Sequence, residues 1–71
     1  MENRTPLEKI PLPFNKEISF EEIVYDNGFR MLRMTIREGR RFTTLELDEM
    51  SATRWRNAFN TWLHPDKEHS A

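Results

Sequence analysis

The sequence lacks cysteine altogether, and this absence removes several ways of stabilising or using a small domain. Without cysteine there is no disulfide, no thiolate ligand for a metal ion and no thiol nucleophile. This usage fits a reducing compartment, and residues 1–6 have neither the basic nor the apolar region of a signal peptide. No apolar run approaches the roughly 18 residues that cross a membrane. We therefore expect a cytoplasmic protein with no membrane association.

Glycine and histidine are scarce, and their positions argue against catalysis. The two glycines, Gly28 and Gly39, both fall at expected turns, which leaves none for a glycine-rich phosphate loop. Four residues near the end of the chain could be drawn as a metal site: His64, Asp66, Glu68 and His69. Pro65 interrupts their spacing, and a solvated tail is the simpler interpretation. We expect no catalytic residue, no cofactor and no metal, and hence a protein that is not an enzyme.

The chain of 71 residues is short enough for one domain only. Chains of this size build a marginal core and usually need a further source of stability. With disulfides excluded, self-association is the expected source, and we expect a homodimer. The sequence divides into an extended, proline-containing arm over residues 1–16, a folded domain over residues 17–64 and a polar tail over residues 65–71. The arm is expected to lie against the domain or a second chain, and it can include a short edge strand.

Turn dipeptides divide the middle of the chain into three expected strands, at residues 17–26, 29–37 and 40–47. Asn27-Gly28 is a strong hairpin signal because both central residues of a type I′ turn need a positive φ. Glu38-Gly39 is read as a second two-residue turn. Two-residue loops at these positions predict that Ile23 faces Leu32 and Glu22 faces Arg33. In the next pair of strands they predict that Leu32 faces Leu45, Met34 faces Thr43 and Thr35 faces Phe42.

Alternation along the expected strands separates a core face from an open face. The core face would carry Ile23, Leu32, Met34, Ile36, Leu45 and Leu47. The open face would carry Phe29, Met31, Arg33, Thr35, Arg37, Phe42, Thr44 and Glu46. Ile18 and Phe20 have the opposite parity to Ile23 and Tyr25, and a bulge at Glu21-Glu22 would bring all four to one side.

An amphipathic helix is the last expected element. Its apolar residues recur at helical spacing and form one stripe that consists of Trp55, Ala58, Phe59, Trp62 and Leu63. Ser51 is the expected N-cap, with Met50 and Trp55 as a hydrophobic staple, and Asp48 is the competing cap. Pro65 should end the helix at or before His64. The fold class is therefore α+β, with a three- or four-stranded antiparallel meander followed by one C-terminal helix. The stripe is core, and one edge of it could reach a second subunit.

The positive charge of the chain is concentrated in its middle. Residues 1–28 have a net charge of −3, residues 29–41 of +4 and residues 42–71 of −2, which together give −1. The middle block owes its charge to Arg30, Arg33, Arg37, Arg40 and Arg41. Guanidinium groups bind phosphates through paired hydrogen bonds, and exposed rings stack on unpaired bases. The open face thus predicts single-stranded nucleic-acid binding, with phosphates on Arg33, Arg37, Arg40 and Arg41 and bases on Phe42 or Phe29.

Two other interpretations of the same residues remain open. Arg33 can simply pair with Glu22 across the hairpin, and arginine on a strand also protects a sheet edge from aggregation. Phe29, Met31 and Phe42 can instead form a contact with another protein, because a sheet with apolar residues on both sides is covered on both sides. A non-catalytic protein–protein interaction module, or a homodimeric scaffold, is therefore the alternative function.

The segment from Phe29 to Leu63 resembles known single-stranded nucleic-acid-binding folds. Its strands Arg-Met-Leu-Arg-Met-Thr-Ile-Arg and Phe-Thr-Thr-Leu-Glu-Leu, joined by Glu-Gly-Arg-Arg and followed by a helix ending Phe-Asn-Thr-Trp-Leu, look like the PUR repeat and the positive cofactor 4 and Whirly proteins. Such a resemblance implies a curved antiparallel sheet against a helix, dimerisation, and binding through Arg33, Arg37 and Phe42. It covers about half of the chain, and those families have four strands, so here residues 7–14 would supply the fourth.

Overall fold

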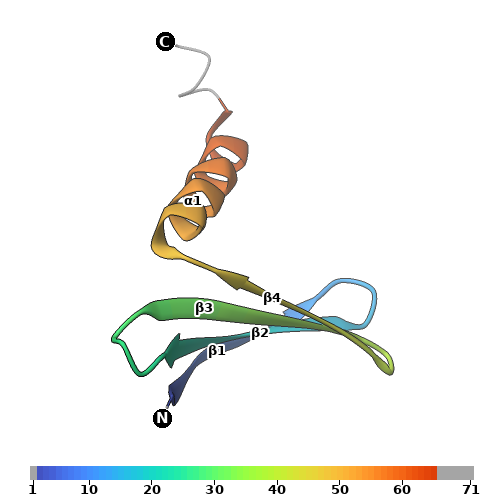
Figure 1. Ribbon diagram of the computed structural model, residues 1–71. Helices are drawn as coiled ribbons and strands as arrows, with labels where there is room; N and C mark the ends of the chain where they lie inside the picture. The colour runs from blue at the N-terminus through green and yellow to red at the C-terminus, as the bar shows by residue number, and fades with distance from the viewer. Residues whose placement is uncertain (1, 66–71) are drawn as a thin grey trace.

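A computed structural model of the chain describes residues 2–65 and consists of four strands followed by one helix (Figure 1). The four strands form one antiparallel sheet in the order β1-β2-β3-β4. The elements are β1 (Asn3–Leu12), β2 (Lys16–Val24), β3 (Arg30–Glu38), β4 (Arg41–Leu47) and α1 (Glu49–Leu63). The predicted α+β class, with a meander and one C-terminal helix, is confirmed, and the sheet has four strands.

The proline-containing arm forms a full edge strand, β1, along β2. Edge strands tolerate proline because one side of the strand has no ladder to complete. Residues 3–6 and 8–12 pair with β2 in two registers, so the bulge lies at Leu7 in β1. The prediction of a bulge at Glu21-Glu22 in β2 is wrong, because β2 pairs with β3 without interruption. A three-residue loop of positions 13–15 joins β1 to β2, and both Phe14 and Asn15 have a positive φ there.

The hairpin between β2 and β3 has a longer loop than predicted. The Gly28 amide donates to the Tyr25 carbonyl at 2.9 Å, and the Tyr25 amide donates to the Phe29 carbonyl at 2.8 Å. Three residues therefore form the loop, and Gly28 takes its left-handed position with φ of 83°. The added loop residue shifts the register, so Ile23 pairs with Met31 and Glu22 with Leu32. The predicted pairs of Ile23 with Leu32 and of Glu22 with Arg33 are wrong.

The hairpin between β3 and β4 turns at Gly39-Arg40 rather than at Glu38-Gly39. Glu38 pairs with Arg41 across this turn, and Gly39 has a positive φ of 65° while Arg40 does not. Glycine at the first central position is typical of a type II′ turn. Each β3 residue consequently pairs with a β4 residue two positions further along than predicted. Leu32 pairs with Leu47 instead of Leu45, and Met34 pairs with Leu45 instead of Thr43. Thr35 pairs with Thr44 instead of Phe42. A shift of two keeps every side chain on its predicted face.

The register shift of one residue in the hairpin between β2 and β3 exchanges the two faces of β2. Ile18 pairs with Ile36 and Phe20 with Met34, so these side chains share the face that carries the helix. Ile23 pairs with Met31 and therefore lies on the opposite face, which corrects its predicted place on the core face. Ile23 is nevertheless 0% exposed, so neighbouring side chains of that opposite face must cover it.

Helix α1 begins directly after β4. Asp48 is its N-cap, because the Asp48 carboxylate accepts from the Ser51 amide at 2.8 Å, and the predicted cap at Ser51 is wrong. The staple positions on either side of this cap are Leu47 and Ala52 rather than Met50 and Trp55. The backbone amide of His64 caps the other end by donating to the Asn60 carbonyl at 3.0 Å, so the predicted end before Pro65 is confirmed.

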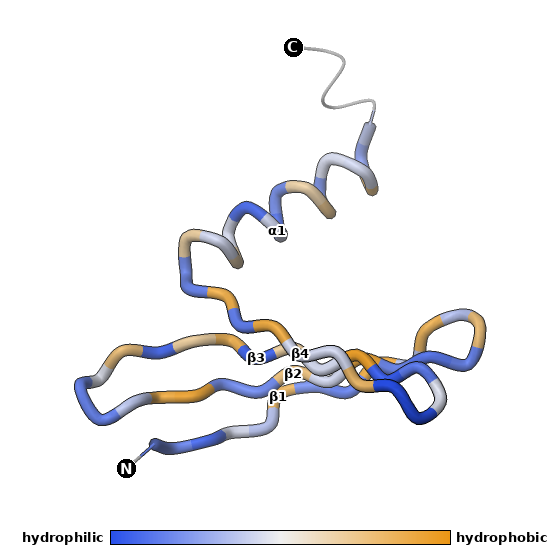
Figure 2. Tube along the Cα trace, turned by 45° about the vertical axis from the view of Figure 1, so that its right-hand side comes forward, coloured by the Kyte–Doolittle hydropathy of each residue, from blue (hydrophilic) through white to orange (hydrophobic). Residues whose placement is uncertain are grey.

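The helix stands away from the sheet instead of lying flat on it (Figures 1 and 2). Among residues 2–65 only Ile23 and Met34 are buried hydrophobic residues, and α1 contains no buried residue. The prediction that the apolar stripe of the helix is core is therefore wrong for a single copy of the chain, because the helix does not lie on the sheet. The radius of gyration is 14.9 Å, whereas a compact domain of this length has one of about 11 Å. A single copy of the chain therefore leaves much of its apolar surface uncovered.

Candidate functional site

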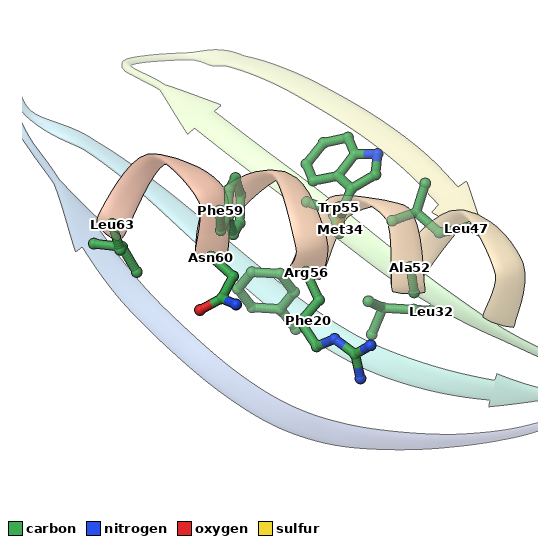
Figure 3. Close-up of a pocket in the computed structure, with 10 residues that line it drawn as sticks. All are labelled: Phe20, Leu32, Met34, Leu47, Ala52, Trp55, Arg56, Phe59, Asn60 and Leu63. Atoms are coloured by element: carbon green, nitrogen blue, oxygen red, sulfur yellow. The ribbon is translucent and has the colours of Figure 1, made fainter. Parts of the chain in front are cut away.

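Between the sheet and α1 lies an open groove of about 510 Å³ (Figure 3). Its sheet wall consists of Phe20, Leu32, Met34 and Leu47, and its helix wall includes Ala52, Trp55, Arg56, Phe59, Asn60 and Leu63. Leu32 and Met34 thus point to the side of the sheet that carries the helix, as predicted. We name this feature the apolar groove, because eight of these ten side chains are apolar.

The helix wall of the apolar groove remains largely accessible. Trp55 and Phe59 pack edge to face, with ring centroids 6.0 Å apart. Phe59 is still 60% exposed, and Trp62, outside the groove, is 80% exposed. Figure 2 shows apolar segments recurring along the helix while it extends away from the sheet. Exposed apolar side chains therefore follow one side of the helix, and an apolar patch of this kind is often functional.

Ion pairs tie the beginning of α1 to the sheet. The Arg30 guanidinium donates to the Glu49 carboxylate at 2.9 Å and to the Glu22 carboxylate at 2.8 Å. Hydrogen bonding to Glu49 raises the pKa of Arg30, so the guanidinium stays charged. The Ser51 amide lowers the pKa of the capping Asp48 carboxyl, which favours the charged cap. These contacts hold the first turn of the helix and leave its remainder free of such ties to the sheet within the described residues.

Arginine and aromatic residues do meet on the sheet face opposite the helix, which we name the arginine face. Arg37 and Phe42 are direct neighbours across β3 and β4, and Arg33 lies on the same face. Phe42 is 63% exposed, so its ring is accessible. Arg40 lies in the adjoining turn, whereas Arg41 pairs with Glu38 and belongs to the helix side of the sheet.

The two alternative base-stacking residues, Phe42 and Phe29, lie far apart on this face. Phe29 precedes β3, and Phe42 lies opposite Arg37 near the far end of that strand. Eight residues of extended chain separate the two positions by about 26 Å at a rise of about 3.3 Å per residue. Phe29 and Phe42 therefore cannot stack on neighbouring bases, although each is more than half exposed.

Arg33 is engaged in a network with two partners that sequence reasoning did not connect. Its Nη2 and Nε atoms donate to one Glu46 oxygen at 2.6 Å and 3.0 Å, and the Tyr25 hydroxyl donates to the other at 3.0 Å. Hydrogen bonds from Arg33 and Tyr25 lower the pKa of Glu46. The bond to Glu46 raises the pKa of both Arg33 and Tyr25. The charge of Arg33 is therefore compensated at close range.

Arg37 also has an acidic partner. Its Nη2 atom donates to the Glu17 carboxylate at 2.7 Å, and Lys9 approaches the same carboxylate at 3.4 Å. This arginine lowers the pKa of Glu17. The Arg37 side chain remains 43% exposed, about twice the exposure of Arg33. Of the two strand arginines, Arg37 is therefore the more accessible to a ligand.

Three residues of the metal site considered for the tail, Asp66, Glu68 and His69, lie outside the described residues. Over residues 2–65, no helix has both the length and the apolar character required to cross a membrane.

A family model described as a family of unknown function, DUF6967, matches residues 1–65 of the chain. No curated protein and no solved structure matches the chain. The resemblance to the PUR, positive cofactor 4 and Whirly proteins stays a prediction.

Proposed function

The chain belongs to DUF6967, a family of unknown function, and from its geometry we propose that it is a non-catalytic protein–protein interaction module that acts as a homodimer. The observation that carries the proposal is the apolar stripe of the amphipathic helix α1, none of whose residues is buried in a single copy. A chain of 71 residues with two buried hydrophobic residues among those described has a marginal core of its own. Association with a second copy would supply the missing burial.

The exposed rings of α1 offer more than half of the area that such an association needs. Trp55, Phe59 and Trp62 are 38%, 60% and 80% exposed, which amounts to about 350 Å² if a buried ring hides about 200 Å². Two copies would supply about 700 Å² of the roughly 1,200 Å² that a stable interface buries. Leu63, which is 62% exposed, and the sheet wall of the apolar groove can add the remainder.

Burial of ring surface is the main favourable contribution to association, at about 25 cal/mol per Å². Lost translational and rotational freedom, ordering of interface side chains and desolvation of polar groups oppose it. The chain has a net charge of −1, so two copies repel each other only weakly.

Sedimentation equilibrium over a range of concentrations tests the proposal. The wild-type chain should have twice the monomer mass of 8.6 kDa, and Trp62→Glu should shift it to the monomer because a charge would be buried at the contact. Asn57→Glu is the matched control: it adds the same charge at an exposed position of α1 on a different side of the helix, and should leave the dimer intact. A wild-type chain that is monomeric at every concentration refutes the proposal.

Single-stranded nucleic-acid binding is the second candidate function, and the Arg37–Phe42 pair on the arginine face favours it. A ring that is 63% exposed beside a half-exposed guanidinium can stack on a base while the guanidinium binds its phosphate. Arg40 in the adjoining turn could bind a neighbouring phosphate, whereas Arg41 belongs to the helix side of the sheet and does not share this face. Arg33 would first have to leave Glu46.

Fluorescence polarisation with a short single-stranded oligonucleotide tests this candidate. If Arg37 and Arg40 bind two phosphates, the logarithm of the affinity should fall with the logarithm of the salt concentration with a slope of about −1.4. Phe42→Ala should weaken binding, whereas Phe29→Ala, which removes an equally accessible ring from the distant end of β3, should not. Equal effects of the two variants, or no binding at low salt, would eliminate this function.

A further inference from the structure

We propose that the two copies pair their β4 strands edge to edge, forming a continuous eight-stranded sheet with both helices on one face. The inference rests on the proposed homodimer and adds its geometry. It starts from the difference between the two edges of the sheet, β1 and β4, each of which presents unpaired backbone groups on its outer side.

The β1 edge carries features that oppose pairing with another strand. Pro6 and Pro11 lack the backbone N–H that a new ladder would need, and the bulge at Leu7 breaks the regularity of the strand. The β4 edge has none of these features. Its sequence, Arg-Phe-Thr-Thr-Leu-Glu-Leu, contains no proline, pairs with β3 without interruption and is rich in residues that favour strands. Pairing through β4 is therefore open, whereas pairing through β1 is obstructed.

The charges along β4 are complementary to those of a second β4 that runs in the opposite direction. Arg41 begins the strand and Arg40 precedes it, whereas Glu46 lies near its end and is followed by Asp48, the N-cap, and Glu49, the first residue of α1. Within one copy Glu46 accepts from Arg33 and Glu49 accepts from Arg30, so basic residues of a second copy would add to these contacts. Antiparallel pairing of two copies places the basic end of each strand beside the acidic end of the other. Parallel pairing would place like charges together, so the sequence of β4 selects the antiparallel arrangement, which a two-fold axis generates.

The side of α1 that carries Trp55 and Trp62 faces toward the β4 edge of the sheet. In Figure 3, Trp55 projects on the side of β3 and β4, whereas Arg56 and Asn60 project on the side of β1 and β2. Trp62 follows Trp55 by two turns and lies on the same side of the helix, with Ala58 between them. A two-fold axis beside β4 and perpendicular to the sheet would bring these sides of the two helices toward each other. The second copy therefore explains why Trp62 is 80% exposed in one copy.

Cysteine cross-linking of the full chain tests the arrangement, because the natural sequence contains no cysteine. A two-fold axis perpendicular to the sheet makes one residue near the middle of β4 face its own copy at a distance that a disulfide spans. Thr43→Cys, Thr44→Cys and Leu45→Cys cover the central positions. Lys9→Cys on β1 is the exposed control. Under mild oxidation, one of the three β4 variants should form the linked dimer at least about tenfold faster than the control, since association raises the effective thiol concentration.

Circular dichroism and sedimentation of each reduced variant show that it is folded and associated before oxidation. If the wild-type chain is a dimer but no β4 variant links faster than Lys9→Cys, the β4 arrangement is wrong and the homodimer stands. If Lys9→Cys links fastest, the interface lies at β1 and the arrangement is again wrong. A monomeric wild-type chain refutes the homodimer and this arrangement together.

Discussion

Replacing Ile23 tests the corrected assignment of the faces of β2. Ile23 is 0% exposed on the side of the sheet away from α1, so Ile23→Ala should cost about 2–5 kcal/mol of unfolding free energy and Ile23→Val about 0.5–1.5 kcal/mol. A chain of this length has a total of about 4–10 kcal/mol. The alanine variant could therefore lose half or more of the stability, whereas the valine variant should remain folded and measurable.

A double-mutant cycle then locates the Ile23 side chain. Because Ile23 and Phe59 lie on opposite sides of the sheet, Ile23→Val and Phe59→Leu should be additive within about 0.5 kcal/mol. Met34 and Phe59 line the same groove, so Met34→Val and Phe59→Leu should couple by about 0.5 kcal/mol or more. Urea unfolding followed by circular dichroism at one fixed protein concentration measures both cycles. Coupling of Ile23 to Phe59 together with additivity of Met34 and Phe59 would refute the face assignment.

Three further predictions follow from single residues. Tyr25 is the chain's one tyrosine, so an ultraviolet titration should show its pKa above the ordinary 10.0, and Glu46→Gln should lower it; an unchanged titration would argue against their hydrogen bond. The pKa values of Glu46 and Asp48 are lowered by folding, so the unfolded chain binds more protons and stability should fall as the pH drops below about 4.5. The thermal unfolding temperature should therefore fall toward acid, and Glu46→Gln should make this fall shallower. An unfolding temperature that rises toward acid would contradict the lowered pKa values of Glu46 and Asp48. Phe14 has a φ of 65°, which costs a residue other than glycine about 1–2 kcal/mol; Phe14→Gly should therefore raise the thermal midpoint, and Asn15→Gly should raise it less because asparagine tolerates this conformation.

The number, order and type of the elements in the folded domain could be predicted from alternation and helical spacing, but the register could not. Asp26-Asn27-Gly28 is compatible with a two-residue and with a three-residue loop, and the choice depends on the bond from Gly28 to the Tyr25 carbonyl. One residue of difference moves Ile23 to the other face. Apolar residues of both parities in β2 therefore indicate a strand with apolar contacts on both faces, not a bulge.

The residues of the arginine face could be predicted from the sequence, but their acidic partners could not, because the partners depend on the register. Parity alone places Arg33, Arg37 and Phe42 together, and that placement holds in the structure. The acidic partners depend on long-range register: Glu46 is 13 residues from Arg33, and Glu17 is 20 residues from Arg37. The predicted register would have placed Thr44 beside Arg33. The apolar groove was not predicted, because helical spacing shows which face of α1 is apolar and not how far that face stands from the sheet.

The block of positive charge in the sequence does not become a block of positive surface. Consecutive strand residues point to opposite sides of a sheet, and each side collects carboxylates from other strands. Arg30 pairs with Glu22 and Glu49, and the network of Arg33 and the pair of Arg37 add two more compensated charges. Arg40 and Arg41 remain at the tip of one hairpin, where an antiparallel copy of β4 would place acidic residues beside them. If both proposals hold, Arg40 would be shared between the dimer contact and a phosphate, and oligonucleotide binding should then weaken as the concentration of dimer rises.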